Sequence, residues 1–264
     1  MKRAVMWVFV AVLGGAFAYC GWRYYNEAYL PNKQITDAVE EQRETFARIK
    51  PDFKHIPEAV SDSKPDSDTP ANETIPDPLA DLKAENEDAV GWLTIDGTNI
   101  DYPIVQAADN SFYLQRGFDK KGNYGLGCPF LDYRCKDGFN GFNSIIYAHH
   151  IKGNAAMFAD IAKYKSSSFM QSCPTGTLLT ENGQHTVLFF AYMTIPSTSF
   201  AYKNIIEDDD KRDEYIDGIF ENASYTFELT SDDLKDNDDL RLLLLSTCTY
   251  EYWEARGVLV GIIE

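Results

Sequence analysis

Basic residues are scarce in this 264-residue sequence, which holds 24 Lys and Arg against 41 Asp and Glu, a formal net charge of −17. A surface this acidic repels phosphate backbones, so the composition argues against nucleic acid as a partner. A glycine-rich phosphate loop after a predicted strand is also missing, which argues against a nucleotide-dependent enzyme. Hydrophobic residues nevertheless make up 44% of the chain, enough for a substantial folded core.

Cysteines and histidines are also few, at five and four. Cys128 and Cys135 have no histidine near them, and their spacing does not match a zinc knuckle. We therefore predict no metal site, and no cofactor. The two cysteines are close enough in sequence to pair around a short loop. The sequence leaves open whether they form a disulfide.

Near the N-terminus, residues 4–22 form a long run without a charged residue, and Lys2 and Arg3 precede this run. A helix needs about 20 apolar residues to cross a bilayer, and leading positive charge favours an N-terminus inside the cell. The run therefore predicts a single-pass anchor in the cell membrane, with the remaining chain extracellular. A cleaved signal peptide is the alternative, because Ala16-Phe17-Ala18 resembles a cleavage site.

Three segments are predicted along the chain. Residues 1–30 form the membrane anchor, residues 31–77 a polar helix and an acidic, proline-rich linker, and residues 78–264 a folded domain. Residues 51–80 contain six of the eleven prolines, seven acids and two bases, so this stretch cannot bury a core of its own. The polar helix, over 35–50, is either a stalk or a brace on the domain.

The domain is rich in short predicted strands separated by turn signals. Strands are expected at 90–95, 100–106, 127–131, 143–149, 177–180, 186–194, 225–229, 240–247 and 257–263, and helices at 78–88, 155–164 and 208–222. Many short strands with turn punctuation favour a closed or nearly closed barrel over a parallel α/β sheet. The predicted class is mostly β with added helices.

Residues 242–248 form the first chemically informative segment, a leucine run that ends in Ser246-Thr247-Cys248. A buried strand with this ending presents a thiol at the rim of a sheet, on a rigid element. Cys248 is therefore the candidate nucleophile. The alternative is a structural cysteine, since an unpaired cysteine packs like a small hydrophobe.

A second apolar strand, residues 145–148, ends in His149 and His150. A thiol needs a base or a cation nearby to become a nucleophile, and histidine is the usual partner. His149 is therefore the candidate base. The alternative is a structural histidine whose ring nitrogens form their hydrogen bonds within the core.

Arg256 lies eight residues after Cys248, at the start of the apolar strand 257–263. Two strands joined by a short loop would bring its guanidinium close to the sulfur. Arginine is always charged and donates from a fixed fork, so it can hold a carbonyl and its developing oxyanion. A surface ion pair with Glu251 or Glu254 is the alternative.

Together these segments resemble the sortase family, in which a T-L-x-T-C strand end is followed by an arginine on the next strand. Leu245-Ser246-Thr247-Cys248 with Arg256 is similar to that signature, and Tyr147-Ala148-His149 to the family's Y-G-H strand end. Further stretches resemble class B sortases: residues 90–95, 100–106, Asp109-Asn110, Tyr113-Leu114, Phe130-Leu131-Asp132 and Met157-Phe158-Ala159-Asp160. The resemblance covers residues 78–264.

The resemblance implies a closed eight-stranded β-barrel with N-terminal helices and a helix inserted between strands 6 and 7. It also implies catalytic roles for Cys248, His149 and Arg256. Substrate contacts are expected from Ser246, Thr247 and His150, which is also expected to modulate His149.

Three positions depart from the family pattern. Leu244 stands where threonine is usual, and Ala148 replaces a glycine, which restricts the backbone beside the base. His150 stands where asparagine usually follows the histidine. The family pattern assigns His149 rather than His150 as the base. Cys128 and Cys135 are not features associated with the family.

The function implied by the resemblance is transpeptidation in a Gram-positive bacterium. Cys248 would cleave a sorting motif of a secreted protein, and the acyl group would pass to a peptidoglycan cross-bridge amine or a pilin lysine. An exported cysteine protease with the same Cys–His pair is one alternative, since water rather than an amine can resolve an acyl-enzyme. A non-enzymatic β-barrel binding module with an inert Cys248 is the other.

Overall fold

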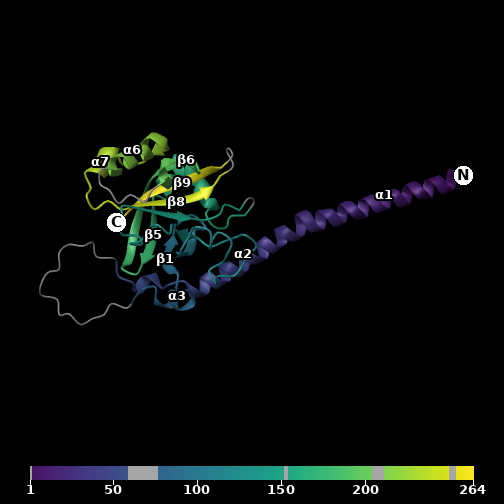
Figure 1. Ribbon diagram of the computed structural model, residues 1–264, viewed down its shortest axis with the longest axis horizontal. Helices are drawn as coiled ribbons and strands as arrows, with labels where there is room; N and C mark the ends of the chain where they lie inside the picture. Colours follow the sequence, from purple (N-terminus) through teal and green to yellow (C-terminus); the bar gives the residue numbers. More distant parts are fainter. Residues whose placement is uncertain (1, 59–76, 152–153, 204–210, 250–253) are drawn as a thin grey trace.

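The computed structural model describes residues 2–58, 77–151, 154–203, 211–249 and 254–264 (Figure 1). The central part of the predicted linker, residues 59–76, lies outside the described residues. The strands are β1 (Ala89–Thr94), β2 (Asp101–Val105), β3 (Phe130–Leu131), β4 (Asn143–Tyr147), β5 (Thr175–Thr180), β6 (Gly183–Pro196), β7 (Ala223–Thr226), β8 (Leu242–Cys248) and β9 (Ala255–Ile263). The α-helices are α1 (Lys2–Tyr24), α2 (Leu30–Ile49), α3 (Ala80–Glu85), α4 (Ser167–Ser172), α5 (Phe200–Lys203), α6 (Arg212–Asn222) and α7 (Ser231–Lys235), with a π-helix η1 (Tyr25–Tyr29) and 3₁₀ helices η2 (Phe53–His55) and η3 (Ala159–Lys165).

The strands close into a barrel. Neighbouring strands follow the order β5-β1-β2-β3-β4-β8-β9-β6, and β6 pairs back with β5, so eight strands form the ring. β7 pairs with β6 outside this ring. The barrel is mixed, because β2 and β3 pair in parallel, as do β4 and β8. The closed eight-stranded barrel expected from the resemblance is confirmed, and α6 lies in the connection between its sixth and seventh strands, β6 and β8.

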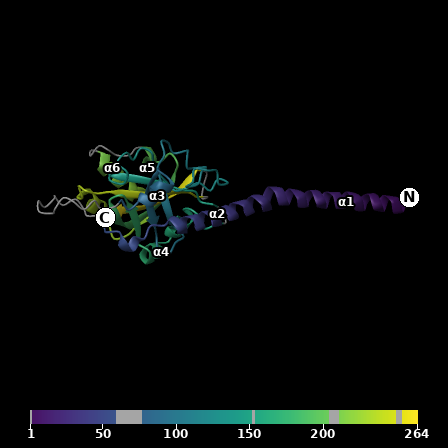
Figure 2. The ribbon, with the colours of Figure 1, turned by 90° about the horizontal axis from the view of Figure 1, so that it is seen from below.

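The leucine run of β8 shows why the barrel needs an outer layer of helices. Successive side chains of a strand point to opposite faces. Leu243 and Leu245 accordingly pack in the barrel interior, whereas Leu242 and Leu244 pack in a second cluster with residues of α5, α6 and α7. These helices lie on one side of the barrel (Figures 1 and 2). Both faces of β8 are therefore buried, which fixes the position of the strand end that carries Cys248.

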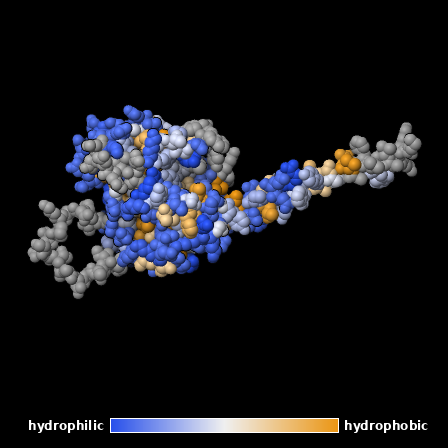
Figure 3. Space-filling view, in the orientation of Figure 1, coloured by the Kyte–Doolittle hydropathy of each residue, from blue (hydrophilic) through white to orange (hydrophobic). Residues whose placement is uncertain are grey.

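The second half of α2 braces the opposite part of the barrel. Phe46 is only 3% exposed, and its ring meets those of Trp92, Tyr102 and Phe118 edge-on at centroid distances of 6.2, 5.8 and 6.3 Å. Apolar residues gather where this helix meets an otherwise largely hydrophilic surface (Figure 3). Of the two interpretations of the polar helix, the structure favours the brace. The division of the chain at residues 30 and 77 stays a prediction.

The N-terminal helices form a rod that projects from the barrel (Figure 1). A membrane-spanning helix needs about 20 predominantly apolar residues. Over the residues that the structure describes, no helix combines the required length with the required apolar character. The prediction of a single-pass protein anchored in the cell membrane by its N-terminal helix, N-terminus inside and domain outside, is therefore wrong. Absence of charge is a weaker criterion than sustained apolar character, and Gly14, Gly15 and Tyr19 lie within the uncharged run.

Several predicted elements differ in length or type. The helix expected at 155–164 is the 3₁₀ helix η3, and the helix expected at 208–222 begins, among the described residues, at Arg212. The strand expected at 127–131 is reduced to Phe130–Leu131. The first residue of the expected strand, Gly127, has a φ of +69° and no room for a Cβ. The backbone at this position therefore cannot be part of a regular strand.

Candidate active site

The ends of β4 and β8 lie side by side at one edge of the sheet. The two strands are parallel, with Tyr147 paired to Ser246. The contact continues beyond β4, because the amide of Ala148 donates to the Ser246 carbonyl at 3.2 Å and the Thr247 hydroxyl donates to the Ala148 carbonyl at 2.9 Å. His149 directly follows Ala148, and Cys248 directly follows Thr247, so the backbones of His149 and Cys248 are neighbours.

Arg256 reaches the same edge through the β8–β9 hairpin. Its Cα is the antiparallel partner of Cys248, and the hairpin continues with a 2.9 Å hydrogen bond from the Thr249 amide to the Ala255 carbonyl. The structure thus brings together the backbones of the three predicted catalytic residues: His149 just after β4, Cys248 at the end of β8 and Arg256 in β9.

The guanidinium of Arg256 donates from Nη1 to the Ala255 carbonyl at 3.2 Å. The side chain is half-buried. Glu254, one of the two acids considered as its ion-pair partner, instead accepts a 3.0 Å hydrogen bond from Ser197. Within the described ranges no carboxylate forms an ion pair with Arg256, and Glu251, the other candidate, lies outside them.

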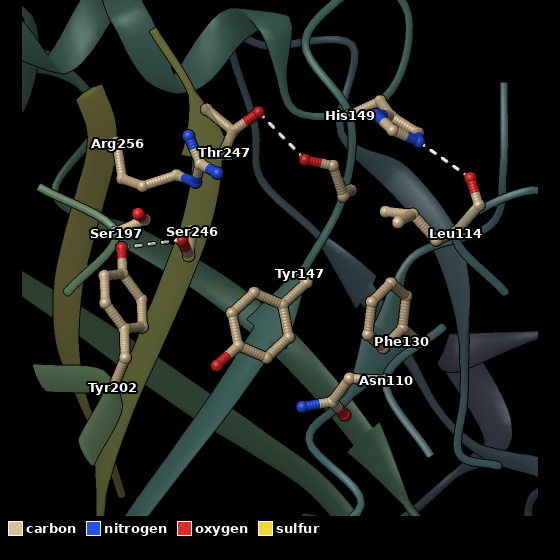
Figure 4. Close-up of a pocket in the computed structure, with 11 residues that line it drawn as sticks. Asn110, Leu114, Phe130, Tyr147, His149, Ser197, Tyr202, Ser246, Thr247 and Arg256 are labelled. Carbon is tan, nitrogen blue, oxygen red and sulfur yellow. Dashed lines mark hydrogen bonds between the residues drawn. The ribbon is translucent and has the colours of Figure 1, made fainter. Parts of the chain in front are cut away.

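The imidazole of His149 is oriented by a backbone carbonyl. Its Nε2 lies 2.7 Å from the Leu114 oxygen, and because a carbonyl only accepts, Nε2 must carry the proton. This bond points away from Arg256 (Figure 4). Gly127 lies behind the ring, where an added Cβ would come within 3.2 Å of His149 Cδ2. In the neutral imidazole, Nδ1 is then the nitrogen that can accept a proton.

A pocket of about 310 Å³ opens beside these strand ends (Figure 4). Its wall combines four predicted site residues with seven others: Asn110, Leu114, Phe130, Tyr147, Ala148, His149, Ser197, Tyr202, Ser246, Thr247 and Arg256. Apolar and aromatic side chains make most of the wall, and hydroxyl groups, the Asn110 amide and the Arg256 guanidinium complete it. Such a pocket suits an uncharged side chain presented by an extended ligand.

The three residues predicted to contact substrate have different surroundings. The Ser246 hydroxyl lies 2.9 Å from the Tyr202 hydroxyl, and Thr247 donates to the backbone of Ala148, so both line the pocket with their hydroxyls already engaged. His150 is not among the residues that line it, and its backbone pairs with Met157.

Sequence reasoning did not assign roles to Asn110, Leu114, Tyr147 or Tyr202. Two of these, Asn110 and Leu114, belong to stretches that resemble class B sortases, and Tyr147 directly precedes the Ala148-His149 strand end, so a signal existed for these three. Tyr202 lies in α5, where the sequence provides no local signal for a pocket residue.

Two other cysteines of the barrel domain are poor candidates for the nucleophile. Cys128 and Cys135 are free thiols, buried in different clusters. The disulfide left open by the sequence is therefore not formed. Burial raises the pKa of Cys128 strongly and that of Cys135 to about 11, and a protonated thiol is a weak nucleophile. Among the described residues, no group of three or more His, Cys, Asp or Glu is arranged to hold a metal ion.

Known proteins with the same architecture identify the family. No protein-family model matches the sequence. Sortase B of Listeria monocytogenes is 29% identical over 252 residues, which cover 95% of this chain and 93% of the relative. A solved structure of sortase B from Listeria monocytogenes is 32% identical, with a TM-score of 0.59 over 70% of this chain and 99% of that one. A solved class B sortase of Streptococcus pyogenes is 30% identical, with a TM-score of 0.61 over 70% of this chain and 96% of that one. The chain therefore belongs to the class B sortases, which are cysteine transpeptidases.

Proposed function

We propose that this chain cleaves a sorting-motif peptide at one backbone amide and transfers the acyl group to an amine. Cys248 is the nucleophile, His149 the acid–base group and Arg256 the donor to the oxyanion. The observation that carries the proposal is the meeting of three strand ends beside one pocket: Cys248 is paired with Arg256 of β9, and His149 follows β4, which pairs with β8 on its other side.

The proposed reaction has two steps. The Cys248 thiolate adds to the peptide carbonyl carbon, the C–N bond breaks, and the leaving amine takes a proton from the His149 imidazolium. The product is a thioester on Cys248. The neutral imidazole then takes a proton from the incoming amine as it attacks the thioester carbonyl, and the C–S bond breaks to regenerate the thiolate. Because Nε2–H of His149 is bonded to Leu114, Nδ1 is the atom that exchanges these protons.

The pocket is the proposed site for a side chain of the sorting motif. Its apolar wall favours an uncharged group, and Ser246 and Thr247, which line it, are retained as proposed contacts. His150 lies next to the base and is proposed to modulate it rather than to bind peptide. Support for a peptide substrate comes from Staphylococcus aureus sortase B, which has been solved as a substrate complex and shares this fold.

The proposed acceptor is an amine, either of a peptidoglycan cross-bridge or of a pilin lysine. The Streptococcus pyogenes relative is described as involved in pilus biogenesis, which favours including a lysine among the acceptors tested. Hydrolysis by water would leave the same first product, so the acceptor has to be tested directly.

The test is a peptide library incubated with the protein, with triglycine, with a lysine-containing peptide, or with neither amine. We expect one motif to be cleaved and, when an amine is present, a product whose mass equals the acyl fragment plus the amine. Hydrolysis products alone in every arm would favour a cysteine protease. No cleavage, together with a Cys248 thiol that resists alkylation in the folded protein, would favour a binding module.

Arg256→Lys is expected to reduce the transfer rate nearly as much as Arg256→Ala. Lysine keeps the charge but loses the planar fork that holds two acceptors in one geometry. Removing one oxyanion donor costs about 10²–10³-fold in comparable acyl-transfer sites. The measurement is the transfer rate at saturating amine, beside the melting temperature of each variant.

A wild-type rate in Arg256→Lys would remove this residue from the proposed site. An exposed ion pair would give such a result, because exposed pairs contribute only about 0–1 kcal/mol.

A further inference from the structure

A buried ion pair stands behind the pocket without lining it. The Asp132 side chain is fully buried, and that of Arg134 is 28% exposed. Arg134 binds it in a bidentate manner, Nε to Oδ1 at 2.9 Å and Nη2 to Oδ2 at 2.7 Å, and its amide donates to Oδ1 at 3.0 Å. A buried carboxylate is costly unless it is paired and hydrogen-bonded. Both conditions are met here.

Two pocket residues donate to the same carboxylate. Asn110 donates from Nδ2 to Asp132 Oδ2 at 3.1 Å, and the Tyr147 hydroxyl donates to that oxygen at 3.0 Å. Burial alone would raise the pKa of Asp132, but the hydrogen bonds and charge of Arg134 outweigh it and lower the pKa. Burial and the nearby carboxylate raise the pKa of Tyr147, so its hydroxyl stays protonated and remains a donor.

Arg134 also holds the end of α5. Its Nη1 donates to the Lys203 carbonyl and its Nη2 to the Tyr202 carbonyl, both at 3.1 Å. The last carbonyls of a helix have no partner within it, so the guanidinium supplies donors that α5 lacks. Tyr202 in turn places its ring 6.2 Å from that of Tyr147, with its hydroxyl beside Ser246 of β8.

We propose that Asp132 and Arg134 form a latch that holds α5 against the barrel and fixes the spacing between Tyr147 and Tyr202 in the pocket wall. Neither member of the pair lines the pocket, but together they contact three residues that do, Asn110, Tyr147 and Tyr202, so these are positioning residues. This inference rests on the proposed function, because it assumes that the pocket binds the peptide. The latch then determines how tightly, and with what side-chain preference, the peptide binds, while the chemistry at Cys248 is left largely unchanged.

The test uses Arg134→Lys, which keeps the charge but cannot reach the carboxylate and two carbonyls together. Arg212→Lys is the matched control, because Arg212 also donates to two successive carbonyls, those of Asn237 and Asp238, and does not line the pocket. The substrate is the best-cleaved library peptide, labelled with a fluorophore and a quencher. We expect Arg134→Lys to raise KM about tenfold or more, the size of a lost charge-assisted hydrogen bond. Its kcat should change far less, and the ratio of kcat/KM between the two best peptides should fall. Arg212→Lys should keep wild-type constants.

The outcomes separate the latch from the function on which it rests. No turnover by the wild-type protein would contradict the proposed function. Wild-type turnover with an unchanged KM in Arg134→Lys, or a loss confined to kcat, would overturn the latch alone. If Arg134→Lys does not fold, Asp132→Asn is the second variant, with the same rise in KM expected. If neither folds, the pair is a requirement of the fold and the latch is rejected.

Discussion

Replacing Cys248 by alanine is expected to abolish both peptide cleavage and transfer to an amine. Both proposed steps pass through a bond to sulfur, so removal of the thiol leaves no route to the acyl-enzyme. The fold should persist, because the change sits at the end of a strand whose leucines remain buried. The measurement is peptide turnover with and without triglycine, compared with the background rate of the peptide alone and with the melting temperature.

Cys173→Ala is the matched control for this experiment. Cys173 is a free, partly buried thiol that packs near Gly97, away from the pocket. We expect it to keep wild-type activity and the acyl-enzyme mass adduct, whereas Cys248→Ala should lose both. Turnover above background in Cys248→Ala would show that the nucleophile lies elsewhere in the chain.

His149→Ala is expected to lose far more activity than His150→Ala. General acid–base catalysis by a placed side chain contributes about 10²–10⁴-fold, and the structure gives only His149 an imidazole that lines the pocket. The measurement is kcat/KM for both variants, beside the melting temperature of each.

The melting temperature makes the comparison of the two histidines decisive. A variant that loosens the loop after β4 would lose stability together with rate, whereas loss of the base should lower the rate at an unchanged melting temperature. Equal losses in the two variants, or a larger loss in His150→Ala, would mean that the assignment taken from the family pattern is wrong.

The parts of the site that lie on long apolar strands could be predicted from the sequence. β4, β8 and β9 are each marked by a run of apolar residues, and the polar residues at their ends are the ones that meet in the structure. The predicted strand boundaries differ from the observed ones by a few residues, as at Gly127. There, the backbone is left-handed, and the Asn123 side chain donates to the Gly127 carbonyl and accepts from its amide, which prevents regular pairing.

The rest of the site depends on contacts between segments that carry no periodic signal. α4, α5 and α7 have four to six residues each, too few to show a helical repeat. Tyr202 and Ser197 reach the pocket from the connection after β6, and Arg134 meets α5 across 68 and 69 residues of sequence. Such positions follow only from the closed barrel, which a pattern within a single segment cannot specify.

The parallel pairing of β4 with β8 has a consequence for how the site comes into existence during folding. The Thr247–Ala148 hydrogen bond joins residues 99 positions apart, and two parallel neighbours cannot be linked by a tight hairpin. Closing so large a loop reduces the conformational entropy of the chain before the contact contributes any stabilisation. A nascent or truncated chain that ends before β8 can therefore form the hairpins of β1–β2 and β5–β6 while still lacking any site. Recovery of enzymatic activity on refolding would report completion of the barrel, not its first local structure.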